Sequence, residues 1–127
     1  MLYPNPKIYG NISVFENCPN LTVSAIQYSQ VSGDISVHAN HSKSTKESIV
    51  SYGYIECPNI YGDISAFTNN AKYLYHVLLG GTQVSGDISV FANSSVLYEL
   101  DLSNTLTTGS LSNLLNKNGL RRLLVNT

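Results

Sequence analysis

One short segment recurs along this chain of 127 residues. The sequence QVSGDIS stands at residues 30–36 and again at 83–89, and two close relatives are IYGNIS at 8–13 and IYGDIS at 60–65. A weaker copy, TTGSLS, follows at 107–112. The glycines of the five copies follow one another after 23, 29, 24 and 23 residues. A period of this length predicts a repeat architecture in which each repeat packs on its neighbours.

A second pattern begins twelve residues before each of the last four of these glycines. It has the form L-x-x-L-x-L in segments 21–26, 50–55, 74–79 and 97–102, and residues 120–125 begin a further copy. Inward positions that alternate in this way are typical of a short strand. The first residues of these strands are expected to form one apolar column: Leu21, Val50, Leu74 and Leu97. Further columns are expected two residues before each repeat glycine (Ile8, Val31, Ile60, Val84, Thr107) and two residues after it (Ile12, Ile35, Ile64, Ile88, Leu111).

The segment LYELDLSNTLTTGSLS, residues 97–112, resembles the L-x-x-L-x-L-x-x-N-x-L-x-G-x-I-P form of plant-type leucine-rich repeats, with Ser in place of Pro in the other copies. The resemblance implies an α/β, β-rich, right-handed leucine-rich-repeat solenoid of about five coils of 23–24 residues. It implies a parallel sheet on the concave face, and turns, 3₁₀ pieces or short strands on the convex side. The position of the internal Asn ladder would be held by Ser29, Pro58, Thr82 and Thr105.

The repeats span nearly the whole chain, which predicts one solenoid domain over residues 1–127. The polar segment 38–48 lacks the apolar period and is expected to be an inserted loop. The two cysteines, Cys18 and Cys57, stand at different phases of the repeat, so we expect reduced thiols rather than a disulfide.

The outward strand positions are expected to gather aromatic and charged side chains on the concave face. The candidate binding residues are Tyr52, Tyr54, Tyr75, His76, Tyr98, Glu99, Asp101 and Arg122. Tyrosine offers a large rigid contact area with a polar tip, which recognition surfaces favour. The structural alternative stays open, because aromatic residues favour strands in any case and Glu99 and Arg122 could form a cross-strand ion pair.

Composition and motif spacing argue against several functional classes. Charged residues make up only 12% and the net charge is -1, which disfavours nucleic acid as a partner. No cofactor or metal is expected, because His76 has no second histidine beside it. The sequence contains no nucleophile motif that would indicate an enzyme. Asp34, Asp63 and Asp87 recur once per coil, which indicates a turn formed through the side chain.

Two functional hypotheses follow from these features. The first is a non-enzymatic binding module whose Tyr-rich concave face recognises a protein, or alternatively a glycan. The second is a structural assembly subunit, a virion or surface-array component that packs through its solenoid ends. The inward residues Leu120, Leu123 and Val125 of the last strand would then support self-association through the C-terminal coil. The start of the sequence lacks the features of a secretory signal and no apolar run could span a membrane, which predicts a cytoplasmic protein or a part of a larger particle.

Overall fold

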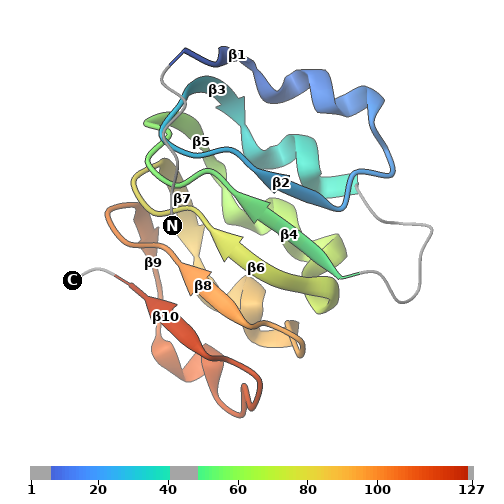
Figure 1. The fold of residues 1–127 in the computed structure, drawn as a ribbon. Helices are drawn as coiled ribbons and strands as arrows, with labels where there is room; N and C mark the ends of the chain where they lie inside the picture. The colour runs from blue at the N-terminus through green and yellow to red at the C-terminus, as the bar shows by residue number, and fades with distance from the viewer. Residues whose placement is uncertain (1–6, 41–48, 126–127) are drawn as a thin grey trace.

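The fold consists of two parallel five-stranded sheets joined by 3₁₀ helices (Figure 1). The computed structural model describes residues 7–40 and 49–125. Sheet A contains β1 (Tyr9–Asn11), β3 (Gln30–Asp34), β5 (Asn59–Asp63), β7 (Gln83–Asp87) and β9 (Leu106–Thr108). Sheet B contains β2 (Val23–Ala25), β4 (Val50–Gly53), β6 (Leu74–Leu78), β8 (Glu99–Asp101) and β10 (Arg122–Leu124). The helices are η1 (Ile12–Asn17), η2 (Ile35–Asn40), η3 (Ile64–Tyr73), η4 (Ile88–Asn93) and η5 (Leu111–Leu114).

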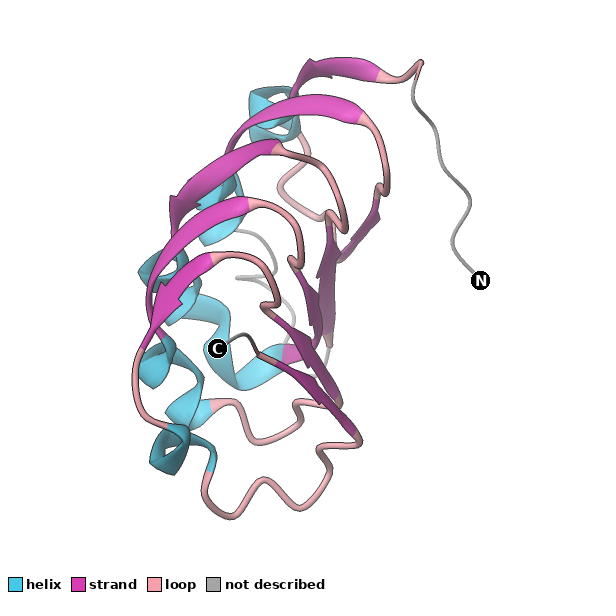
Figure 2. Ribbon diagram, turned by 90° about the vertical axis from the view of Figure 1, so that its left-hand side faces the viewer, coloured by secondary structure: helices cyan, strands magenta, loops and turns pink. Residues whose placement is uncertain are grey.

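Each coil runs through a strand of sheet B, a strand of sheet A and a 3₁₀ helix, and then enters sheet B again. Figure 2 shows the two sheets as separate layers, with the helices stacked in a row beside sheet A. This arrangement confirms a β-rich, solenoid-like repeat. Of the inserted loop expected at 38–48, residues 38–40 end η2, and residues 41–48 lie outside the described part of the chain.

The repeated glycine and acid form the corner between each sheet A strand and its helix. Asp63 and Asp87 cap η3 and η4, because their Oδ1 atoms accept the backbone N–H of Ser65 and Ser89 at 2.8 Å. The preceding glycines have positive φ, +118° at Gly62 among them, a region that residues with a Cβ rarely adopt. The expected turn role of the recurring acids is confirmed.

The apolar columns predicted from the period form the core of the described coils. The two columns beside the repeat glycine are buried in the middle of the stack, at Val31, Ile60, Val84, Ile35, Ile64 and Ile88. At the ends of the described stack, Ile8 and Leu111 are exposed by 51% and 58%, because no further coil among the described residues covers them, whereas Ile12 stays buried. Burial of Ile8 and Leu111 would therefore require a further coil, while one neighbouring coil is enough to bury Ile12.

The prediction that Tyr52 and Tyr54 lie on the outward face is wrong. Both side chains are fully buried in the core. Tyr52 pairs with Val77, which is an inward residue, and Gly53 is the outward residue between the two tyrosines. The two rings therefore contribute to packing inside the coils and are removed from the candidate binding face.

A one-residue irregularity in strand pairing explains this error. Val50 pairs with Leu74 as expected, but the next residue, Ser51, pairs with His76, so Tyr75 has no counterpart in β4. The β4 segment has one residue fewer before its inward position than the β6 segment, and one residue more after the strand. The distance from Val50 to Gly62 is therefore the same as in the other coils, so the spacing of the repeat does not reveal the shift. A slip of one residue in a strand exchanges its inward and outward faces.

The extra residue after β4 changes which side chain takes the position of the internal Asn ladder in this coil. Cys57, not Pro58, occupies the ladder position, because its backbone N–H bonds to the carbonyl of Tyr54 as that of Thr82 bonds to the carbonyl of Leu79. The Cys57 thiol is buried and lies 3.4 Å from the hydroxyl of Ser29 in the previous coil. Both cysteines are unpaired, as predicted, with Cys18 exposed and Cys57 buried.

Candidate binding face

An aromatic cluster lies on the outward face of sheet B, on strand β6 and at the entrance to β8. The rings of Tyr75 and Tyr98 are stacked, with centroids 5.0 Å apart and planes inclined by 16°. The imidazole of His76 meets both rings edge-on, at 4.6 Å from Tyr75 and 5.8 Å from Tyr98. All three side chains are half-buried, so each keeps part of its surface open to solvent. We call these three residues the aromatic cluster.

Polar residues continue the cluster along the neighbouring strands. The column that contains His76 passes through Glu99 to Arg122, which pair in register on β8 and β10. On the other side, the hydroxyl of Ser51 lies 3.2 Å from Nδ1 of His76 and fixes the orientation of the ring. The repeat pattern does not predict this contact, which depends on the pairing shift in β4.

Asp101 faces outward as expected, but its carboxylate is engaged within the turn that follows β8. Its Oδ1 accepts hydrogen bonds from the backbone N–H of Ser103 at 3.0 Å and from the Ser103 hydroxyl at 2.6 Å. The same atom would lie 2.6 Å from a Cβ added at Gly80 in the previous coil. These contacts give Asp101 a role in joining two coils, so its carboxylate is less available to a partner than that of Glu99.

The two tyrosines that sequence reasoning placed on this face instead surround a buried histidine. Nε2 of His38 lies 2.6 Å from the phenolic oxygen of Tyr54, and the His38 ring stacks on that of Tyr52 with centroids 4.1 Å apart. Burial raises the pKa of Tyr54 to about 12, and it also raises the pKa of Tyr52. Both phenols are therefore neutral at physiological pH and act as core residues.

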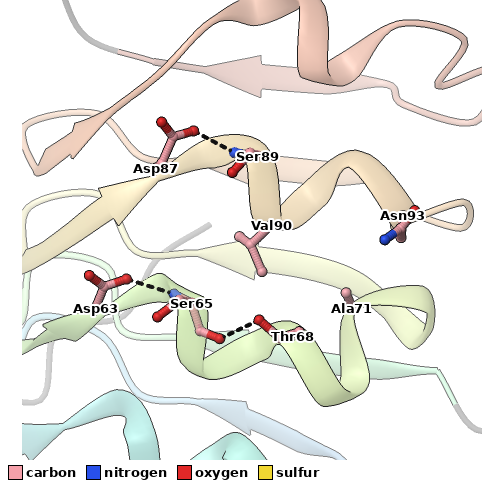
Figure 3. Close-up of a pocket in the computed structure, with 8 residues that line it drawn as sticks. All are labelled: Asp63, Ser65, Thr68, Ala71, Asp87, Ser89, Val90 and Asn93. Atoms are coloured by element: carbon pink, nitrogen blue, oxygen red, sulfur yellow. Dashed lines mark hydrogen bonds between the residues drawn. The ribbon is translucent and has the colours of Figure 1, made fainter.

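A shallow polar groove of about 410 Å³ lies between η3 and η4 on the opposite side of the coil (Figure 3). Its lining consists of Asp63, Ser65, Thr68, Ala71, Asp87, Ser89, Val90 and Asn93. The two carboxylates are already bonded to the helix N-termini, and the Thr68 hydroxyl donates to the carbonyl of Ser65 at 2.6 Å. The groove is the seam between two coils, and the hydrogen bonds of these three side chains lie within their own coils.

Within residues 7–40 and 49–125, no group of three or more His, Cys, Asp or Glu side chains is arranged to hold a metal ion. None of the described helices is long and apolar enough to cross a membrane. Comparison with known protein families found no family model that matches the chain, and comparison with curated proteins found no match either.

Proposed function

We propose that the chain is a right-handed leucine-rich-repeat solenoid that acts as a non-enzymatic recognition module. Its L-x-x-L-x-L segments supply the strands of sheet B, and its glycine-containing segments supply sheet A and the 3₁₀ helices. This division of each repeat agrees with what the resemblance to plant-type repeats implies. The outward face of sheet B corresponds to the concave surface in that comparison.

The stacked pair Tyr75 and Tyr98 is the observation that carries the proposed function. Tyr75 lies on β6 and Tyr98 directly precedes β8, and both side chains are outside the core and partly exposed to solvent. Tyrosines in such positions supply much contact area and lose little conformational entropy when a partner binds. Glu99 and Arg122 beside them provide charges of both signs, which favour a protein partner with complementary polar groups.

The test compares capture of a partner by the wild-type chain with capture by Tyr75→Ala and Tyr98→Ala variants. Tyr61→Ala is the matched control, because Tyr61 is 48% exposed and belongs to sheet A. A hot-spot tyrosine contributes about 2 kcal/mol, so each cluster variant should bind a partner of the wild-type chain about 30-fold more weakly. Equal binding by all four chains, or a loss limited to Tyr61→Ala, would contradict the proposal.

A further inference from the structure

Each end of the coil stack presents a strand edge from both sheets. Among the described strands, β1 and β2 pair on one side only, and so do β9 and β10 at the opposite end. We call the first pair the leading end and the second pair the trailing end. All pairings in both sheets are parallel. The free edge at the trailing end can therefore continue the ladder at the leading end of a second copy with the strand direction preserved.

The contact between the helix-capping side chain of one coil and the repeat glycine of the next coil also lacks a partner at each end of the described stack. Inside the chain, the capping side chain of each coil lies against the repeat glycine of the next, as Asp87 does at Gly109 and Asn11 does at Gly33. Gly10 at the leading end has a similar positive φ of +123°, and no atom of the described residues lies within 4 Å of the place where its Cβ would stand. Ser110 is the corresponding cap at the trailing end, and the coil after it contributes no glycine to cover it among the described residues.

Apolar side chains are exposed at both ends in positions that the inner coils bury. At the trailing end, Leu111 is 58% exposed, although its counterpart Ile88 is buried, and it lines a cavity of about 420 Å³ that reaches Ile88 and Leu102; Leu115 nearby in the sequence is 73% exposed. At the leading end, Ile8 is 51% exposed, although its counterpart Val31 is buried. Stacking of one copy on another would bury both surfaces, as successive coils already do within the chain.

Charge selects head-to-tail contact over contact between two trailing ends. Residues 102–125 contain Lys117, Arg121 and Arg122 and neither Asp nor Glu, so two trailing ends would bring like charges together. Residues 7–29 at the leading end contain one Lys7 and one Glu16, and therefore no net charge. We propose that the trailing end docks on the leading end of a second copy and extends the coil stack in register. Such a heterologous contact produces open-ended chains of subunits unless a ring closes.

The experiment blocks each end separately in the full chain and then mixes the two variants. The leading-end variant carries Ile8→Lys and Val23→Lys, and the trailing-end variant carries Leu111→Lys and Leu115→Lys; all four residues are more than half exposed. Tyr61→Lys, on the side wall of sheet A, is the control. Mass is measured by sedimentation over a concentration series up to high micromolar, and circular dichroism reports whether each variant is folded.

Head-to-tail docking predicts that the wild-type and control chains grow beyond 13.8 kDa with concentration, and that each blocked variant alone stays at the mass of one chain. The mixture of the two blocked variants should form a complex of two chains and grow no further, because each retains one intact end. The proposal is overturned if the wild-type chain stays monomeric throughout. It is also overturned if the leading-end variant alone forms dimers, which would mean contact between trailing ends. These results do not depend on the aromatic cluster, so they are separable from the proposed recognition function.

Discussion

The Nε2 atom of His38 lies 2.6 Å from the phenolic oxygen of Tyr54 inside the closed coils. Both side chains are fully buried. His38 stands in the column that Phe67 and Phe91 fill in the following coils, so an imidazole replaces a phenyl ring at this level. The hydrogen bond satisfies a buried polar atom on each side, which such a replacement requires.

This relationship predicts how the coil responds to substitution of His38. His38→Ala removes a buried ring and a partner of Tyr54, and we expect the free energy of unfolding to fall by about 3 kcal/mol. His38→Phe refills the column but loses the hydrogen bond to Tyr54, so we expect a fall of about 1 kcal/mol. Urea unfolding followed by circular dichroism measures both changes. An alanine variant as stable as the wild-type chain would contradict the assigned packing.

The raised pKa values of the buried tyrosines predict a loss of stability at alkaline pH. Burial raises the pKa of Tyr54 from 10.0 to about 12, and the pKa of Tyr52 is raised in the same direction. Above about pH 10 the unfolded chain has released protons that the folded chain still holds, so the free energy of unfolding falls as pH rises. This contribution is fully present below about pH 10.

Urea midpoints measured from neutral pH to about pH 11 check this prediction. The Tyr52→Phe, Tyr54→Phe double variant should lose less stability over the alkaline range than the wild-type chain, although it starts from a lower value. Equal slopes in the two proteins would mean that these phenols ionise freely in the folded state.

The repeat glycines should differ in importance according to what lies beside them. Gly86 has a φ of +108°, and a Cβ there would overlap the carboxylate of Asp63. Gly10 has a φ of +123°, and none of the described residues would contact a Cβ there. We therefore expect Gly86→Ala to lower the free energy of unfolding by about 3 kcal/mol and Gly10→Ala by about 1 to 2 kcal/mol. Chemical denaturation of the two variants tests the order, and a larger loss for Gly10→Ala would refute it.

The two thiols should differ in reactivity. Cys18 is exposed and Cys57 is buried within the polar ladder. After storage with a reductant and its removal, we expect a thiol reagent to modify Cys18 in the folded chain and to reach Cys57 only after denaturant is added. The Cys18→Ser variant is the control, since its folded form should show almost no reaction. Rapid reaction of that variant without denaturant would be inconsistent with a buried Cys57.

Much of the fold could be predicted from the repeat alone, because burial in stacked coils depends mainly on spacing. The columns through Ile35, Ile64 and Ile88, and the capping role of Asp63 and Asp87, followed from residues that return at the same phase. The coil that contains β4 departs from the repeat. It has one residue fewer before the inward position of the strand and one residue more beside Pro58. These two changes leave the total spacing intact, so periodicity cannot reveal them.

The candidate binding face was predictable only where this phase held. Tyr75, His76, Tyr98, Glu99 and Arg122 lie on coils without the irregularity, and they remain on the outward face. Tyr52 and Tyr54 were assigned to the wrong face. The contact between Ser51 and His76 and the engagement of Asp101 with Ser103 depend on side-chain geometry across or after strands, which the pattern of apolar residues does not specify.

Mapping of tyrosine nitration by mass spectrometry tests most directly which rings face outward. In the folded chain, Tyr75 and Tyr98 should be nitrated at rates comparable with that of exposed Tyr61, whereas Tyr52 and Tyr54 should stay unmodified until the chain is unfolded. Nitration of Tyr52 and Tyr54 in the folded chain, with Tyr75 and Tyr98 protected, would contradict the strand phase and remove the proposed recognition face.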